Sequence, residues 1–228
     1  MSLPSDPEPG RRSPRLSNRP TTLAVLTAAS LWLGTAMPAQ GFDADDLARL
    51  THTGSCETCD LSDADLSGRQ LTRARLQGTD LSAADLRQSV LVGADMRSVS
   101  LVRARLESAD LTGVDLVSAD LFGALLSDAV LVRARVGAAE LIGADLTAAR
   151  LEGVDFTGSR LRSAQLAGAD LRRADFAAAD LQRADLTGAN LSGADLSLAQ
   201  GLTQAQLDDA CGNADTLLPS GMTVGTCP

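Results

Sequence analysis

The most reactive side chains in this sequence belong to four cysteines and a single histidine. Cys56 and Cys59 form a Cys-x-x-Cys motif, whereas Cys211 and Cys227 lie near the C-terminal end. The Cys-x-x-Cys spacing suits a structural disulfide, a pair of free thiols, or a redox or half-zinc site. A tetrahedral zinc site needs four ligands, and even with His52 the local set stays short. We favour the structural disulfide and predict no metal site.

Nucleophilic or acid–base catalysis requires a nucleophile, a base and an orienting group close together. The sequence has no tyrosine, and its one histidine is His52. His52 precedes the long repeated region described below, so we interpret it as an exposed residue and not as a base. The sequence therefore predicts a protein that is not an enzyme and uses no cofactor.

The composition indicates what must position these side chains. Leu, Ala, Asp, Gly and Arg dominate the 228 residues, lysine is absent, and Trp32 is the single tryptophan. A core built from aromatic residues is excluded, so a small packing unit must be repeated many times. The net charge of -9 also argues against a nucleic-acid-binding protein, which normally carries a basic surface.

Every fifth residue from Leu61 to Leu196 is apolar without interruption, which gives 28 positions, 24 of them Leu. The other four are Met96, Val136, Phe156 and Phe176. A small residue, usually Ala, lies two residues before each apolar one, and Asp often lies between them, so the consensus is Ala-Asp-Leu-Ser-Gly. Such internal repetition takes priority over any helix or strand assignment.

A period of five fits neither a straight helix nor a straight strand, because the apolar side would rotate with each step. The chain must therefore turn once in each repeat. Within one repeat the Ala and the Leu are two residues apart, so on an extended segment they share one face while the Asp between them points to solvent. Stacked turns can then bury ladders of Leu and Ala and pair the backbone of successive coils.

This run of Ala-Asp-Leu-Ser-Gly units resembles the pentapeptide-repeat family. The resemblance covers residues 59–198 and implies an all-β fold, a right-handed quadrilateral parallel β-helix with four repeats per coil and about seven coils. Arg69 departs from the pattern, since it takes an inward small-residue position in the first coil, where an unpaired buried charge is costly. We expect an imperfect first coil that is partly open to solvent.

A solenoid needs caps at both ends. Residues 42–58 predict an N-terminal helical cap, with Phe42, Leu47 and Leu50 on its apolar side. Residues 199–228 predict a C-terminal cap, in which Thr203 and Gln206 form a capping-box signature for a helix through about Ala210, with Gly212 as its stop.

With coils about 4.8 Å apart, the predicted rod is too long for a disulfide between its two ends. We therefore expect Cys56 to bond to Cys59 and Cys211 to bond to Cys227. The second bond would hold the tail segment Leu217, Leu218 and Pro219 over the last coil. In the same fold Asp60 and Asp80 would stack, which invites a calcium-site interpretation, but the glycine-rich calcium-binding repeat is missing. Solvated carboxylates that accept turn amides are the better interpretation.

Residues 1–41 have the layout of a secretory signal peptide. Four arginines precede an apolar run from Leu23 to Ala36, which small residues follow. We expect cleavage between Ala36 and Gly41 and a periplasmic or secreted protein. An uncleaved segment that anchors the protein to a membrane, or a location in the thylakoid lumen, are the alternatives. Once the segment is cleaved, no stable membrane span is expected.

The outer faces are where a binding function would lie. Sorted into coils of twenty residues, Val102, Phe122 and Ile142 stack at an outward position where nearby repeats carry Ser, Arg or Gln. Such exposed apolar residues are typical of contact surfaces. A second, weaker group on another face consists of Val90, Val92, Val130 and Val132.

These observations predict a non-catalytic exported scaffold, or protein-binding solenoid, of the periplasm or cell envelope. Its partner would be an unknown protein or a second copy of the chain, and not nucleic acid. The alternative comes from the family resemblance, which implies a DNA-mimic regulator or inhibitor of a type II topoisomerase. A signal peptide and the arginines among the acidic residues weigh against that alternative.

Overall fold

The computed structural model describes residues 41–227, so the predicted targeting segment, except for Gly41, lies outside the described residues. The elements are α1 (Ala44–Thr53), α2 (Gln204–Asp208), β1 (Cys211–Gly212) and β2 (Gly225–Thr226). The two short strands pair in parallel. In this part of the chain no helix has the length and apolar character to cross a membrane.

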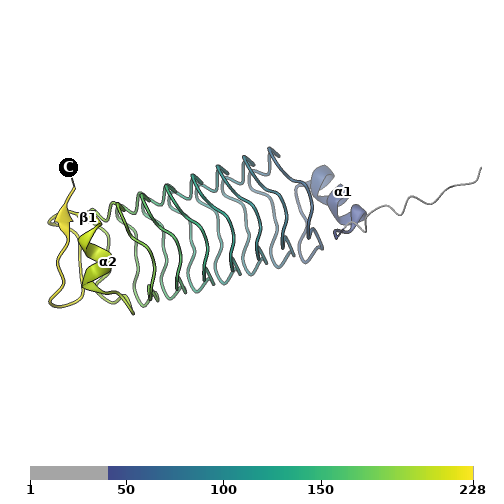
Figure 1. The fold of residues 1–228 in the computed structure, drawn as a ribbon. Helices are drawn as coiled ribbons and strands as arrows, with labels where there is room; N and C mark the ends of the chain where they lie inside the picture. Colours follow the sequence, from purple (N-terminus) through teal and green to yellow (C-terminus); the bar gives the residue numbers. More distant parts are fainter. Residues whose placement is uncertain (1–40, 228) are drawn as a thin grey trace, which may run out of the picture. The chain divides into compact units, whose positions relative to one another are not determined.

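Between the two helices the chain winds into a stack of coils (Figure 1). Each repeat contributes one residue that forms a parallel β-bridge with the residue twenty positions later, from Ser55 with Arg75 to Asp180 with Gln200. Each side of a coil forms a bridge of a single residue. None of these bridges between α1 and α2 extends into a strand of two or more residues. The ladder begins at Ser55, four residues before the predicted start of the repeats at residue 59.

The five-residue repeat pairs its backbone in both directions along the stack. The amide of Leu61 donates to the carbonyl of Asp80 at 2.8 Å, and the amide of Asp80 donates back to the carbonyl of Cys59 at 2.8 Å. A turn then follows, in which the amide of Ala64 donates to the carbonyl of Leu61 at 3.2 Å. The same pattern recurs at nearly every repeat, so the stack satisfies backbone groups that would otherwise be buried without partners.

The core is a continuous column of inward side chains. All 28 apolar positions of the repeat are buried, and Leu71, at 8% exposure, is the most accessible of them. Phe156 and Phe176 stack on one another with ring centroids 5.2 Å apart. Because each buried Leu or Phe stabilises the fold by about 1.5 to 3 kcal/mol, the repeated column can offset chain entropy despite a narrow cross-section.

Three inward small-residue positions hold hydroxyl side chains, and each hydroxyl has a partner. Ser89 and Ser159 donate to the carbonyls of Leu86 and Phe156, both at 2.7 Å, and Thr79 donates to the carbonyl of Cys56. These hydroxyls are fully buried. Because they are hydrogen-bonded, they fit the column without an unsatisfied polar group.

Helix α1 packs against the first coil, as Figure 1 shows. Asp43 caps its start by accepting the amide of Asp45 at 2.8 Å, and Gly54 ends it in a left-handed conformation at φ 68°. Leu50 is buried in the core. Leu47 and Phe42 are partly buried and pack against the same core. The expected helix is therefore present, although it starts at Ala44 and extends to Thr53.

At the other end α2 begins after Thr203, as expected, but it ends at Asp208. Gly212 does not stop the helix, because it belongs to strand β1. The side chain of Gln206 donates to the carbonyls of Leu181 at 2.9 Å and Ala184 at 2.8 Å, which gives partners to backbone oxygens of the preceding coil. Leu207, on the inner side of α2, is completely buried.

The unit that contains residues 41–227 includes its whole core and both disulfides. Backbone hydrogen bonds within this stretch join successive coils and both ends of the stack. Residues 41–228 therefore include every described interaction of the solenoid.

Candidate interaction surface

Val102, Phe122 and Ile142 lie in register on consecutive coils, and we call this column the apolar stripe. The amide of Arg103 donates to the carbonyl of Phe122 at 2.9 Å, and the amide of Gly123 donates to the carbonyl of Ile142 at 3.1 Å. The Phe122 side chain is 44% exposed, whereas Val102 and Ile142 are half-buried. The structure thus places the three predicted residues together, with the aromatic ring as the most accessible member.

Leu125 extends the stripe and was missed by the sequence reasoning. It is 38% exposed and lies just after the turn formed by Phe122 and Gly123. In the other repeats, the position directly before the inward residue holds Asp, Arg or another residue. Leu125 is the one leucine at this position between residues 60 and 195. This departure from the repeat pattern is the feature of the sequence that indicates Leu125 as a surface residue. An exposed Phe and an exposed Leu at one corner enlarge the apolar area.

The second predicted group, Val90, Val92, Val130 and Val132, lies on a different face. All four side chains are half-buried, and the coil that separates the two pairs carries Asp110 and Thr112. This group is therefore interrupted and less accessible than the apolar stripe. Since none of its members reaches the exposure of Phe122, the apolar stripe is the stronger candidate for a contact surface.

Aspartates before the inward residues support the corners. The Asp60 carboxylate accepts hydrogen bonds from the Ser62 amide at 3.1 Å and from the Ser62 hydroxyl at 2.7 Å. Both bonds lower the pKa of Asp60, and the hydroxyl has the larger effect. Asp80 accepts the amide of Ser82 at 2.9 Å in the same way. These carboxylates serve turn amides, which agrees with the structural interpretation of the aspartate column.

Arginines interrupt the acidic columns on several faces. Arg135 pairs with Asp115 in the preceding coil at 2.7 Å, and Arg160 pairs with Glu140 at 2.8 Å. Within one repeat, the guanidinium of Arg172 lowers the pKa of Asp170, mainly through a direct hydrogen bond. The surface between the helices is therefore mixed in sign and does not form an unbroken acidic strip.

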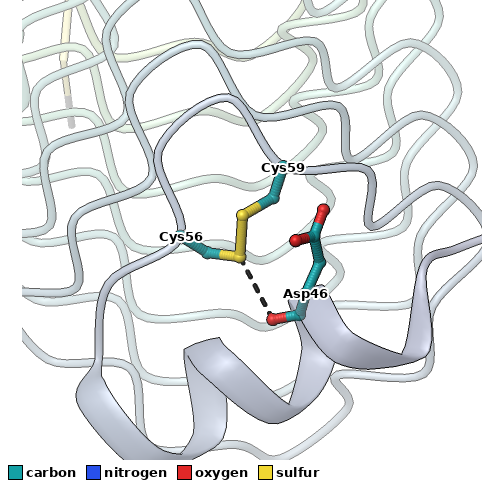
Figure 2. A group of neighbouring side chains, drawn as sticks. All are labelled: Asp46, Cys56 and Cys59. Carbon is teal, nitrogen blue, oxygen red and sulfur yellow. Dashed lines mark hydrogen bonds between the residues drawn. A yellow bond between two sulfur atoms is a disulfide. The ribbon is translucent and has the colours of Figure 1, made fainter.

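The Cys-x-x-Cys motif lies at the N-terminal end of the core (Figure 2). A disulfide joins Cys56 to Cys59, and the two residues, at 1% and 3% exposure, occupy the inward positions of the first bridge-forming turn. The Cys56 sulfur contacts the backbone carbonyl of Asp46 at 3.1 Å, and the guanidinium of Arg49 lies 2.6 Å from the Cys59 sulfur. The pairing is the one that the sequence predicts, and both cysteines lie in the same buried cluster as Leu50 of α1.

Asp46, Cys56 and Cys59 lie close enough together to resemble a metal-ligand group. Their chemistry does not fit that role, because the two sulfurs are bonded to each other and cannot act as thiolates. The Asp46 carboxylate is also engaged, since one oxygen accepts from Arg49 at 2.6 Å and the other from the Asp60 amide at 2.9 Å. The group is better described as the joint between α1 and the first coil.

The C-terminal disulfide joins Cys211 to Cys227, and it therefore closes a segment that includes β1 and β2. The tail continues the ladder, because Leu217 forms a bridge with Asp195. The tail segment therefore lies over the last coil, as expected, although the Leu217 side chain points outward and is 52% exposed. Leu218, the next residue, packs against the core instead.

His52 and Arg69 are both accessible. The ring of His52 lies in the last turn of α1, where Nδ1 is 2.7 Å from the carbonyl oxygen of Ala48.

Arg69 is exposed and lines an open cavity of about 300 Å³ with Leu50, Thr51 and Leu71. The first coil is open to solvent at this point, as expected, so Arg69 avoids the cost of burying an unpaired charge.

The chain has clear similarities to known repeat proteins. The family model described as pentapeptide repeats matches in eight copies, over residues 59–97, 89–128, 139–177, 159–197 and 174–211. A trypsin-treated variant of QnrB1, described as a plasmid-mediated fluoroquinolone resistance protein, is 20% identical with a TM-score of 0.53, and the match covers 70% of this chain and 80% of that one. No curated protein matches the sequence.

A second solved structure is HetL, a pentapeptide repeat protein involved in heterocyst differentiation regulation from the cyanobacterium Nostoc sp. strain PCC 7120. It is 29% identical with a TM-score of 0.30, and the match covers 81% of this chain and 93% of that one. Of these two structures, the QnrB1 variant supports a shared fold.

Proposed function

Because the chain belongs to the pentapeptide-repeat family, whose members fold as right-handed β-helices, we propose that it is a non-catalytic scaffold that binds a protein through its outer faces. The observation that carries this proposal is the apolar stripe, with Phe122 44% exposed on a solenoid whose other outward side chains are mostly polar. A folded protein that exposes an aromatic side chain on a ladder of apolar neighbours has a surface suited to binding another protein.

We further propose that the repeats from residue 59 to residue 198 form about seven coils of a four-sided helix, with α1 and α2 as end caps. The buried side chains of Leu50 and Leu207 support this role, because each covers apolar groups at one end of the column. The side-chain amide of Gln206 supports it as well, because it donates hydrogen bonds to the backbone carbonyls of Leu181 and Ala184 at the end of the stack. Caps of this kind keep a solenoid from stacking end to end with other copies.

Export is the second part of the proposal. The two disulfides support an oxidising location such as the periplasm or the extracellular space. The sequence of residues 1–41 supplies the expected signal. An attached segment that anchors the protein in a membrane is the alternative arrangement.

Fractionation of a bacterial host that expresses the full chain with a C-terminal tag tests export. We expect the tagged protein in the periplasm or medium, with a new N-terminus between Ala36 and Gly41 and both disulfides formed. The fractions give the location, and intact mass with and without thiol alkylation gives the new N-terminus and the state of both disulfides. A full-length, reduced protein in the cytoplasm would contradict the proposed location.

Regulation of a type II topoisomerase is the second candidate function, and it rests on the fold shared with QnrB1. Ion pairs such as Arg135 with Asp115 and Arg160 with Glu140 weigh against it, because they divide the acidic columns that a DNA mimic would need. A supercoiling assay with gyrase and residues 41–228 separates the two functions. Inhibition or protection of gyrase at stoichiometric amounts would favour the regulator over the exported scaffold.

A further inference from the structure

The apolar stripe lies near the middle of its face. The bridge-forming residues of that face run through Asp60, Asp80, Ser100, Asp120, Glu140, Arg160, Asp180 and Gln200. Phe122 follows Asp120, so coils of the same face extend on both sides of the stripe. A surface centred in this way can meet a second copy of itself over its full length.

The charges on this face differ between its two halves. Asp60, Asp63 and Asp80 are exposed before the stripe, and Arg160, Arg162 and Arg183 are exposed after it. The opposite charges in the second half are partly neutralised, since Glu140 pairs with Arg160 at 2.8 Å and Asp180 lies 3.9 Å from Arg162. Arg103 is the single basic residue on the acidic half of the face between residues 60 and 120.

A two-fold axis through Phe122 would reverse the direction of one rod relative to the other. Coils two steps before the axis then meet coils two steps after it, so Asp80 lies opposite Arg160 and Arg162 of the second copy. Three steps away, Asp63 lies opposite Arg183, each three residues after the bridge-forming residue of its coil. Near the axis, Val102 faces the coil of Ile142, and the two Phe122 rings meet at the centre. An isologous interface requires this kind of self-complementarity.

We propose that this face binds a second copy of the chain, side by side and antiparallel, with the apolar stripe at the centre of a two-fold symmetric dimer. The inference rests on the proposed function as a protein-binding scaffold and names its partner. Charge complementarity favours a second copy, because the acidic half of one face fits the basic half of the other. A parallel arrangement would instead place Asp80 on Asp80 and Arg162 on Arg162.

Light scattering after size exclusion tests the dimer with residues 41–228 under oxidising conditions. We expect the wild type to be a dimer at about 100 µM. Phe122→Asp should raise the dissociation constant of the dimer by roughly tenfold or more. The matched control is Val132→Asp, which places the same charge on the face that carries the weaker valine group. That variant should remain a dimer, and circular dichroism should show that both variants are folded.

Charge reversal then tests the antiparallel register. Asp80→Arg alone and Arg162→Glu alone should each weaken the dimer, because each places like charges in facing coils. The double variant Asp80→Arg/Arg162→Glu should recover the affinity, since the opposite charges face each other again. Arginine already occupies the position equivalent to Asp80 at residues 75, 105 and 135, so the substitution suits the repeat.

Each result has a definite meaning. A dimer that survives Phe122→Asp, or a double charge reversal that is no better than the single ones, overturns the proposed interface. A monomeric wild type overturns the second copy as partner. The scaffold function would then depend on whether position 122 contacts a different protein, which the crosslinking experiment at the end of the Discussion decides separately.

Discussion

At the scale of single residues, aspartate recurs before the inward leucine because its carboxylate closes the corner that follows. Asp185 accepts the amide of Thr187 at 3.0 Å, and Asn190 accepts the amide of Ser192 at the same distance. The neutral amide oxygen of Asn190 thus performs the same task as a carboxylate. What the position requires is an oxygen acceptor two residues before the amide, and a negative charge on that acceptor strengthens the bond.

This equivalence predicts different outcomes for two substitutions at one site. Asp185→Asn should lower the free energy of unfolding at pH 7 less than Asp185→Ala does, because the acceptor oxygen stays in place and only the charge is lost. Asp185→Ala should lower it by roughly 0.5 kcal/mol, the low end for a hydrogen bond, since the site is exposed. Urea denaturation measures both values, and an equal loss in the two variants would contradict the acceptor role.

Stability should also depend on acidity through these carboxylates. Hydrogen bonds from Arg87 lower the pKa of Asp85, and those from Ser197 lower the pKa of Asp195. A carboxyl with a lower pKa in the folded state contributes stability above its unfolded value of about 4, and this contribution is lost as pH falls through the lower folded value. We therefore expect the free energy of unfolding to decline below about pH 4.

Urea titrations from neutral to acidic pH check this expectation. The double variant Asp85→Asn/Asp195→Asn, which removes two of the titrating groups, should show a shallower decline. An increase in stability on acidification, or an unchanged slope in the double variant, would show that these groups do not supply the effect.

The corners also constrain the backbone. Ala148 has a φ of 56°, in the left-handed region, and its neighbour Ala149 points inward and is completely buried. Ala148→Gly should raise the free energy of unfolding by roughly 0.5 kcal/mol, because it relieves the steric cost of that region and this gain exceeds the entropy cost of glycine.

The control for this substitution is the adjacent alanine. Ala149→Gly should destabilise the protein by about 1 to 2 kcal/mol, because it removes a buried methyl group and adds backbone freedom. Thermal or urea denaturation of the two variants measures the difference. Similar losses in both would mean that the left-handed corner carries no appreciable steric cost for alanine.

At the scale of elements, the two disulfides belong to opposite ends of the stack. Cys56 and Cys59 lie in the first turn beside α1, and the bond between Cys211 and Cys227 spans a sequence separation of 16 residues around β1 and β2. In a solenoid each coil contacts only its neighbours, so the loss of one bond should affect one end. Two independent local effects are therefore expected.

Replacing the C-terminal pair tests this independence. Cys211→Ser/Cys227→Ser should lower the free energy of unfolding by about 2 to 3 kcal/mol, as expected for a closed loop of this length. Hydrogen exchange should become faster in α2, β1 and β2 and stay unchanged in α1. The matched variant Cys56→Ser/Cys59→Ser should reverse the pattern, and faster exchange at both ends in either variant would contradict it.

The sequence predicts the middle of these elements well and their ends less well. The unbroken apolar period determines which side chains enter the core from Leu61 to Leu196, because inward and outward directions follow from the backbone geometry of the repeat. The ends have no such period. The placement of Cys56 inside the column, the outward side chain of Leu217 and the end of α2 at Asp208 depend on local packing that no spacing rule specifies.

The candidate surface shows the same division. Periodicity predicts that Val102, Phe122 and Ile142 stack in one column, which the structure contains. It does not predict how much of each side chain remains exposed, because neighbouring side chains across the corner determine that. Leu125 contributes to the apolar surface from the next side of the coil, and a column-by-column comparison of the sequence does not include it.

At the scale of the whole molecule, residues 41–227 form a stack of paired coils with a mixed-sign surface, and the apolar stripe lies near the middle of one face. Such a molecule has rigid faces, because its backbone is paired from coil to coil. Binding therefore requires little ordering of the scaffold itself, which favours affinity. We propose that the apolar stripe is the surface through which this rod contacts a protein.

Photo-crosslinking in living cells tests that claim most directly. The full chain would carry a photo-reactive phenylalanine derivative at position 122 or, as a matched control, at position 132 on another face. The account predicts a strong crosslinked product at position 122, with twice the mass of the chain if the partner is a second copy, and little or none at position 132. No product at position 122, or equal products at both positions, would contradict the claim that the apolar stripe is the contact surface.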